Sequence, residues 1–325
     1  AIENNRMFKQ IEHQFEEFVK ASVTAIESRD PATKGHSFRV AAMSVSLARA
    51  VNTVREGPLS GIQFSQVQLK ELEFAGLLHD FGKVYIDPQI FLKGKKLFPK
   101  DMSLLMMRLN FLYRSLELTY SEYDPESKKT VVSSTGKERL EKLTEIIGLI
   151  IRMNEPTVTM GDSDVLLDRI LAMQSELSCT DLEGFPIPIL TEEEITNLKI
   201  RRGSLNDQER KIIQSHVDYT YSFVSKIPWP REYEAIPEIT AYHHEMLDGS
   251  GYPKGVRGRE NIPIQARIMA IADVFDALIA SDRPYKRAIP FEQVLAILRN
   301  EADTGRLDKD LVELFIQVKA WESIA

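Results

Sequence analysis

The residues best suited to chemistry in this sequence are its histidines, because there are only six and most stand beside groups that suit a metal site. Asp80 follows one histidine directly, and two other histidines are adjacent in the chain. Imidazole and carboxylate ligands suit borderline divalent metals, and one carboxylate can bridge two ions. The candidate ligands are therefore His36, His79, His216, His243 and His244. The sixth, His13, is expected to have a surface or packing role.

Each of these signals is ambiguous when it is taken alone. Asp80 follows an apolar run, and a carboxylate at the end of a buried helix needs a partner because unpaired burial is costly. Either a metal ion or a hydrogen bond at the helix end would provide that partner. Asp273 lies in a stripe of alanine and methionine residues that faces inward. Metal coordination or a salt bridge, for example to Arg267, would each explain it.

The elements that position these residues are predicted to be helices, because apolar residues recur mostly at three- and four-residue spacing. The predicted helices include residues 2–28, 36–51, 69–79, 237–244 and 266–277. Asn206 and Glu209 form a predicted capping box that opens a helix carrying His216, and residues 248–253 form a turn-rich loop. The first helix is either a lead-in from an upstream domain or the first core helix. Its expected buried face consists of Phe8, Ile11, Phe15, Phe18, Val19 and Ala25.

The stretch from Pro99 to Ile195 differs from the rest of the chain in charge. It holds 10 Lys and Arg against 18 Asp and Glu, whereas the remainder holds 31 against 30. Helical patterns at about 99–121, 136–153 and 164–178 predict a helical insertion, with a polar segment between the first two. Its apolar stripe predicts burial of one face, namely Leu140, Leu143, Ile147 and Ile150. The insertion either controls access or forms a dimer contact, or it folds back onto its own domain.

Bulk composition narrows the class of protein only slightly. The chain has 325 residues, of which 43% are hydrophobic and 27% charged, and its net charge is −7. A general nucleic-acid binder would carry a strong basic excess, so we expect no direct DNA or RNA binding. The longest aliphatic run, residues 146–151, is too short to span a bilayer, and no signal peptide is visible. The single cysteine, Cys179, excludes an internal disulfide and favours a reducing cytoplasm.

Taken together, the motifs resemble those of the HD-GYP family, a branch of the HD metal-dependent phosphohydrolase superfamily. A His-Asp pair alone is a weak signal, whereas the HHExxDGxGYP pattern at residues 243–253 is highly specific. The similarity covers about residues 20–98 and 196–318. The segments that carry it are Gly35–Ser37, Leu78–Lys83, His216, His243–Pro253, Ile271–Leu278 and Arg283–Lys286.

The resemblance implies an all-α fold, an HD-type helical bundle, that hydrolyses cyclic di-GMP through a hydroxide bound between two metal ions. The implied metal ligands are His36, His79, Asp80, His216, His243, His244 and Asp273. Asp80 would bridge the ions and act as a catalytic residue with Lys83, which is suited to stabilising the transition state. The alternative for Lys83 is a solvent-exposed lysine at a helix end. Iron or manganese is the expected metal, with zinc and nickel also compatible.

Further implications of the resemblance concern the substrate and the domain organisation. Family members with a third metal have a glutamate where this chain has Ala32, so we expect two ions. The implied substrate contacts are Gly251, Tyr252, Arg283 and Lys286. Arg283 has the alternative of capping a helix, and Asp248 is expected to orient its loop through local hydrogen bonds. The implied parts are a lead-in helix at 1–30, a catalytic domain at 31–98 plus 196–325, and the acidic insertion at 99–195.

Three functions remain open from the sequence. The first is a phosphodiesterase that opens cyclic di-GMP to linear pGpG, with further cleavage to GMP as an open step. The second acts on another cyclic dinucleotide, such as a mixed GMP–AMP ring, and the third is a non-catalytic or gated cyclic-dinucleotide receptor. The presence of every expected ligand favours an enzyme. A homodimer through the insertion or the N-terminal helix, and a sensory domain upstream of Ala1, are further expectations.

Overall fold

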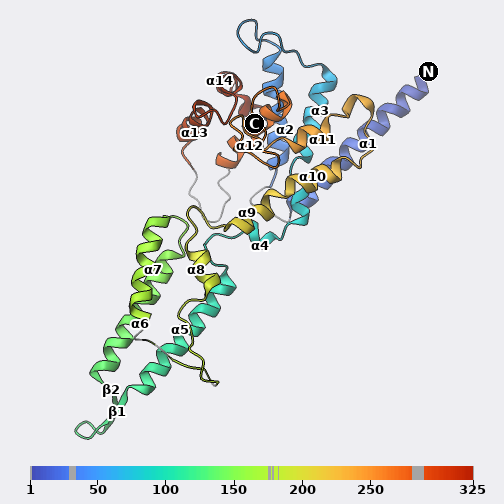
Figure 1. The fold of residues 1–325 in the computed structure, drawn as a ribbon. Coiled ribbons are helices and arrows are strands. Elements are labelled where there is room, and N and C mark those ends of the chain that lie inside the picture. The colour runs from blue at the N-terminus through green and yellow to red at the C-terminus, as the bar shows by residue number, and fades with distance from the viewer. Residues whose placement is uncertain are drawn as a thin grey trace. The chain divides into compact units, whose positions relative to one another are not determined.

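The computed structural model describes residues 2–28, 34–174, 177, 179–181, 183–279 and 289–324. The chain forms two compact units, one made of Ala1–Phe91 with Lys211–Ala325 and the other of Leu92–Arg210. Both units are mainly helical, as predicted (Figure 1). Among the described residues, no helix is both long and apolar enough to cross a membrane.

The first unit is a bundle of helices around one hydrophobic core. Its α-helices are α1 Ile2–Glu27, α2 His36–Val51, α3 Gln66–Leu78, α4 Pro88–Phe91, α10 His216–Val224, α11 Ile236–Ala241, α12 Ile264–Ile279, α13 Phe291–Asp303 and α14 Lys309–Gln317. The described residues of this unit also form the 3₁₀ helices η2 Phe81–Tyr85, η3 Arg231–Tyr233 and η4 Ala320–Ile324. Helix α2 packs against α3 and α12, and α10 packs against η2 and α11. These contacts bring together segments that are far apart in the sequence.

The second half of α1 belongs to the core of this unit. Val19 and Val23 are buried, and Phe15 packs against the core from its edge. The predicted buried face is wrong for Phe18, which is 68% exposed, and for Ala25, which is also exposed. The buried positions follow a four-residue spacing that ends at Glu27, so the helix is rotated relative to the prediction. The side chains of Phe8 and Ile11 lie outside the described set.

The helix predicted to carry His216 is interrupted. Helix α9 runs from Asp207 to Gln214, and α10 begins at His216 after a single intervening residue. The capping box at its start is confirmed, because the backbone N–H of Asn206 donates to the Glu209 carboxylate and the Glu209 N–H donates to Asn206 Oδ1. His216 therefore stands at the junction of two short helices rather than inside one long helix.

The second unit has a core of its own, formed by α5 Pro99–Thr119, α6 Ser134–Met153, α7 Met160–Gln174 and α8 Glu192–Leu198. Leu143 and Ile150 of the predicted apolar stripe are fully buried, and Leu140 is nearly so. They pack against leucines of α5, such as Leu109 and Leu112, in the same core. Because the stripe is buried within its own unit, it gives no support to a dimer contact.

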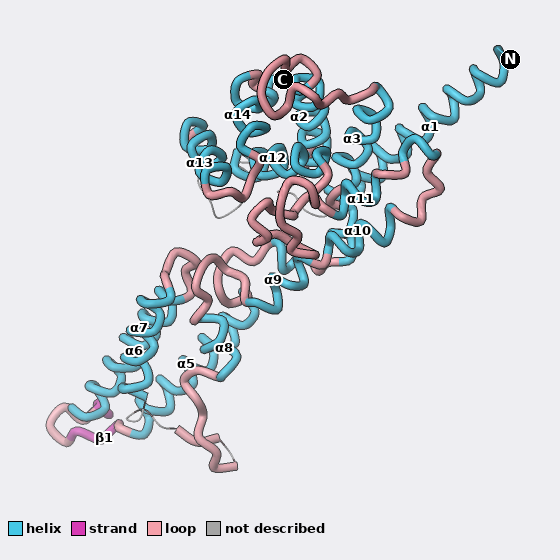
Figure 2. The backbone as a smooth tube through the Cα atoms, turned by 45° about the horizontal axis from the view of Figure 1, so that its top comes forward, coloured by secondary structure: helices cyan, strands magenta, loops and turns pink. Residues whose placement is uncertain are grey.

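A small β-hairpin in this unit was not predicted. Strands β1 Ser121–Asp124 and β2 Lys129–Val132 pair antiparallel, with Ser121 opposite Val132 (magenta in Figure 2). The Asp124 carboxylate accepts hydrogen bonds from the backbone N–H groups of Glu126 and Ser127, which closes the turn. The sequence showed only a polar segment here, but the hydrogen bonds of Asp124 in the turn allow it to form a hairpin.

Two buried lysines belong to the second unit. Lys93 Nζ lies 2.6 and 2.8 Å from the two Glu209 carboxylate oxygens. Lys96 is completely buried, and its ammonium donates to the backbone carbonyls of Val158 and Leu198 and to Ser163 Oγ. Burial lowers the pKa of Lys96. The first lysine thus has a carboxylate partner, whereas the second is satisfied by neutral oxygens.

Candidate metal centre

Three of the candidate histidines share one structural device at the ends of short helices. His79 caps α3, His216 follows α9, and His243 follows α11. Each ring donates its Nδ1–H to a backbone carbonyl three residues earlier, at 2.7 Å to Gly76 and at 2.6 Å to Ile213 and Thr240 respectively. The last carbonyls of a helix lack an intrahelical partner, so they are available as acceptors for these rings.

This bonding fixes the tautomer of all three rings, because a carbonyl can only accept. In the neutral form of each ring, Nε2 of His79, His216 and His243 is consequently the unprotonated acceptor. All three are buried, and none has a hydrogen-bond partner within the described part of the chain. Buried polar atoms without partners are costly, so this arrangement fits atoms prepared to ligate a metal ion.

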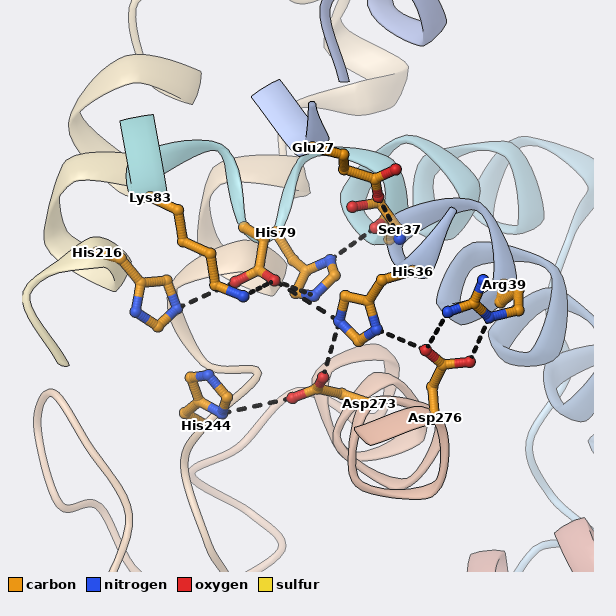
Figure 3. A network of polar contacts seen from close by, with 12 residues as sticks. Glu27, His36, Ser37, Arg39, His79, Lys83, His216, His244, Asp273 and Asp276 are labelled. Atoms are coloured by element: carbon orange, nitrogen blue, oxygen red, sulfur yellow. Dashed lines mark hydrogen bonds and ion pairs between the residues drawn. The ribbon is translucent and has the colours of Figure 1, made fainter. Parts of the chain in front are cut away.

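His36 is held by charged residues from the opposite end of the sequence. Its Nδ1–H donates to Asp276 of α12 at 2.7 Å, and Arg39 donates to the same carboxylate through Nε at 2.6 Å and Nη2 at 2.9 Å (Figure 3). The other ring nitrogen, Nε2, lies 3.1 Å from Asp273 Oδ1 and 3.6 Å from Asp80 Oδ2. A carboxylate behind a histidine is a common means of orienting a metal ligand.

The start of α2 places His36 in this position. Gly35 adopts a left-handed conformation with φ of 72°, which favours glycine. The carboxylate of Glu27, the last residue of α1, accepts the backbone N–H groups of Gly35 and Ser37 at 2.7 and 2.8 Å. The unpaired amides at the beginning of α2 are thereby satisfied by α1.

Two carboxylates lie among the rings. Asp80 Oδ1 is 3.3 Å from His216 Nε2, and Asp80 Oδ2 is 3.5 Å from His79 Nε2. Asp273 Oδ2 is 3.6 Å from His244 Nδ1. Among the described residues, candidate ligand atoms form three groups, and the atoms inside each group lie within 4.8 Å of one another. The groups are His216 with His243 and His244, His36 with His79 and Asp273, and His79 with Asp80 and His243.

The protonation states in this cluster suit cation binding. Burial lowers the pKa values of His216 and His243, and it lowers that of His244 to about 3. For Asp80 and Asp273, burial alone would raise the pKa, but Lys83 and nearby histidines hold the pKa of Asp80 below the usual range, and histidines, chiefly His36, do the same for Asp273. His216, His243 and His244 therefore offer neutral imidazoles at neutral pH, and Asp80 and Asp273 offer ionised carboxylates, the forms that metals require.

His36 differs from the other rings in its pKa. Burial disfavours its charged form, but its hydrogen bonds to Asp273 and Asp276 raise the pKa to about 9. The carboxylates around His36 thus stabilise its protonated form.

Lys83 and Tyr252 lie beside the cluster. Lys83 Nζ is 2.6 Å from Asp80 Oδ2, and its side chain is only 21% exposed, so the alternative of a solvent-exposed lysine is wrong. The Tyr252 ring packs on His244 with centroids 4.7 Å apart. Burial, reinforced by Asp273 and Asp80, raises the pKa of Tyr252, so its hydroxyl stays protonated. Both groups can donate hydrogen bonds to an anion.

The loop that carries Tyr252 is closed by a buried glutamate. The Glu245 carboxylate accepts the backbone N–H groups of Lys254 and Val256 at 2.7 and 3.1 Å. Gly251 lies against the backbone of residues 244–246, where an added Cβ would come within 2.3–2.6 Å of three backbone atoms. The expected local hydrogen bonds of Asp248 are confirmed, because its Oδ1 accepts from the Ser250 N–H and hydroxyl.

A close approach joins η2 to α10. The Gly82 N–H donates to Thr220 Oγ1 at 2.8 Å, and the Thr220 hydroxyl donates to the carbonyl of His79 at 3.0 Å. A Cβ on Gly82 would lie 1.9 Å from the carbonyl oxygen of His216. Glycine at this position therefore lets the segment after Asp80 reach the helix that begins with His216.

The structure brings all seven predicted ligands together in the first unit. That they bind metal stays a prediction, as does substrate contact by Gly251 and Tyr252. The salt bridge from Asp273 to Arg267 is wrong, because Arg267 pairs with Asp308 at 2.5 Å, whereas the basic partner 3.1 Å from Asp273 is His36. Arg283 and Lys286, with Ala32, lie outside the described residues.

Sequence reasoning missed the residues that orient the ligands, chiefly Asp276, Arg39 and Glu27. One signal could have revealed Asp276. It stands three residues after Asp273 in an otherwise apolar helix, where a second carboxylate also needs a partner.

With this geometry in place, comparisons with known proteins identify the family. Two HD domain family models match the chain, one over residues 33–171 and one over residues 190–311. The matched ranges contain all seven candidate ligands and the HHExxDGxGYP segment. The chain belongs to the HD domain family and is of the HD-GYP type.

Several curated proteins are similar to this chain. The 3′3′-cGAMP-specific phosphodiesterase 3 of Vibrio cholerae is 39% identical over 103 residues, which cover 32% of this chain and 21% of that protein. The cyclic di-GMP phosphodiesterase response regulator RpfG of Xanthomonas campestris is 33% identical over 182 residues, covering 56% and 43%. The cyclic di-GMP phosphodiesterase of Thermotoga maritima is 37% identical over 161 residues, covering 49% and 40%. The chain spans less than half the length of each.

Proposed function

We propose that this chain is a metal-dependent phosphodiesterase that hydrolyses cyclic di-GMP, with linear pGpG as its first product. One observation carries the proposal: the three buried Nε2 atoms without hydrogen-bond partners converge with two ionised carboxylates. The relatives named as cyclic di-GMP phosphodiesterases support this class of substrate.

The proposed centre consists of two divalent ions, iron or manganese, held by the seven clustered residues. Five imidazoles and two carboxylates form a mixed nitrogen and oxygen donor set that suits such metals. When bound, the ions supply Lewis-acid activation of the phosphate and of water. Asp276 and the three helix-end carbonyls orient the rings, so the donor atoms need little rearrangement.

The remaining residues have roles that follow from charge and position. Lys83 offers an ammonium beside Asp80 that would bind the non-bridging phosphate oxygens and stabilise negative charge developing there. The protonated Tyr252 hydroxyl would donate to the substrate. Glu245 and Gly251 keep the Tyr252 loop closed, which holds this donor in place before substrate arrives.

A mixed GMP–AMP ring is the second candidate substrate. Relatives named 3′3′-cGAMP-specific phosphodiesterases from Vibrio cholerae match this chain at 39% and 44% identity over 103 and 116 residues. The metal-centre residues would meet the same phosphodiester in either ring, so the two substrates differ only in base recognition.

The test is turnover of both cyclic dinucleotides, followed by chromatography, with protein purified without oxygen and loaded with Fe(II) or Mn(II). Asp80→Asn is compared with Asp87→Asn, because Asp87 is exposed and lies only seven residues away. We expect metal-dependent product from the wild type and from Asp87→Asn, and loss of at least a hundredfold in Asp80→Asn. Binding of nucleotide without turnover, at a verified load of two metals, would refute the enzyme in favour of a receptor.

A further inference from the structure

Two exposed tyrosines stack on each other beside the candidate metal centre. Tyr85 ends η2 and Tyr219 lies in the first turn of α10, and their ring centroids are 5.0 Å apart with 28° between the planes. Tyr85 is 60% exposed and Tyr219 is 42% exposed. The pair therefore presents an aromatic face to solvent, a feature for which the proposed chemistry at the metal ions has no use.

The contact between η2 and α10 fixes this pair relative to the centre. A 3₁₀ helix has three residues per turn, so Tyr85 shares a face with Gly82, which packs directly on α10. In α10, Tyr219 is three residues after His216 and lies on the same side of the helix, one turn further along. The stacked rings are thus anchored one turn from a candidate ligand and two residues from Lys83.

The expected ligand explains why an aromatic face would lie there. A cyclic dinucleotide joins each phosphate to nucleosides whose bases have broad π faces, and such bases bind exposed aromatic side chains by stacking. The tyrosine pair lies about one helical turn, 5.4 Å along the axis, from His216, and each base of the ligand is joined to its phosphate through a single ribose. A phosphate held beside Lys83 and His216 would therefore place one base within reach of the tyrosine pair.

We propose that the outer face of Tyr85, supported from behind by Tyr219, is a stacking site for one purine base of the cyclic dinucleotide. The inference rests on the proposed function and adds a subsite for substrate binding. Stacking tolerates any base, so this site raises affinity without selecting between guanine and adenine. Tyr219 acts as a positioning residue because its ring supports the one that faces the ligand.

The test compares Tyr85→Leu and Tyr219→Leu with Tyr221→Leu in the metal-loaded chain. Tyr221 is a suitable control because it is 49% exposed on the same helix but two positions on from Tyr219, which places it about 200° around the helix. The measurements are KM and kcat for cyclic di-GMP, and the inhibition constant of inorganic phosphate, which has no base. The thermal midpoint reports whether each variant keeps its fold.

We expect Tyr85→Leu to raise KM by about tenfold or more, with kcat and the phosphate constant within about twofold of wild type. Tyr219→Leu should raise KM by a smaller factor. Tyr85→Phe, which keeps the aromatic ring, and Tyr221→Leu should both have the KM of the wild type. A KM within twofold of wild type in Tyr85→Leu would overturn the proposal. So would a parallel loss of phosphate binding or of thermal stability, since that would show a structural role.

Failure of this inference is distinguishable from failure of the proposed function. A wild-type chain that turns over neither cyclic dinucleotide refutes the function, and the stacking site is then judged by the dissociation constant of cyclic di-GMP. An unchanged dissociation constant in Tyr85→Leu would reject the site.

Discussion

Replacing Asp276 by asparagine should weaken metal binding although Asp276 is not one of the candidate ligands. Its carboxylate is 4% exposed and accepts three hydrogen bonds, one from His36 and two from Arg39. Asparagine has the same shape but only one oxygen, so its NH₂ group must face an N–H donor of either His36 or Arg39. In either orientation the negative charge behind His36 is removed, so the group that orients this ring becomes a weaker, neutral one or turns a donor toward it.

The contacts of Asp276 determine how much metal affinity and stability the substitution should cost. Loss of a carboxylate behind a metal-binding histidine typically reduces metal affinity by about 10- to 100-fold. Loss of a buried, charged hydrogen bond costs about 1.5–3 kcal/mol of stability. We therefore expect at least a tenfold rise in the metal dissociation constant and about 2 kcal/mol loss in the free energy of unfolding.

The assay is a competition titration of Mn(II) against a chromophoric chelator, together with urea unfolding of the metal-free protein. Asp303→Asn is the matched control, because Asp303 pairs with Lys309 where both side chains are more than 60% exposed. A metal dissociation constant for Asp276→Asn within twofold of the control would refute the orienting role of Asp276.

Three further predictions concern packing, charge burial and phosphate binding. Gly82→Ala should cost about 3 kcal/mol or more in urea unfolding, because its Cβ would meet the backbone of His216 at 1.9 Å, whereas Gly148→Ala in open space on α6 should be neutral or stabilising. Lys96→Met should lower the free energy of unfolding by about 2–4 kcal/mol, because three buried oxygens lose their hydrogen-bond donor. The control Lys95→Met, at an exposed ion pair, should lower it by less than about 1 kcal/mol, and equal urea midpoints for the two variants would contradict this prediction. Lys83→Met should lower kcat/KM for cyclic di-GMP about a hundredfold with the metal content unchanged, as measured by elemental analysis, and an unaltered kcat/KM would exclude a role in phosphate binding.

The full set of candidate ligands could be predicted because the ordered motifs resemble those of a known family, whereas each residue taken alone was ambiguous. Histidines and aspartates beside apolar runs, such as His79 and Asp273, must be satisfied once the helices pack. The ordered motifs then identified the family, and the structure brings every predicted ligand into one cluster.

The orienting residues could not be predicted in the same way, because their partners are distant in sequence. Asp276 and His36 are separated by 240 positions, and only the packing of α2 on α12 brings them together. The break before His216 was equally hidden, since the apolar spacing continues from α9 into α10.

The wrong face of α1 has a simple physical origin. Phe18 is large and apolar, and hydrophobic spacing alone places it inside. The residues that are buried are instead Val19, Val23 and Glu27, which lie four residues apart on one face of the helix. Because Glu27 is polar, the sequence does not show this face as an apolar stripe. Its burial makes sense only with the amides of Gly35 and Ser37 that it satisfies.

The two ways of holding the histidine rings give the two sides of the centre different dependence on the rest of the fold. The rings of His79, His216 and His243 are aligned by carbonyls three residues away, so short stretches of chain suffice to orient them. His36 acquires its orientation only after α12 has docked. Each of these three rings is therefore oriented locally, but they meet only when α3, α10 and α11 have packed, and full metal affinity reports that the N- and C-terminal parts of the unit have also come together.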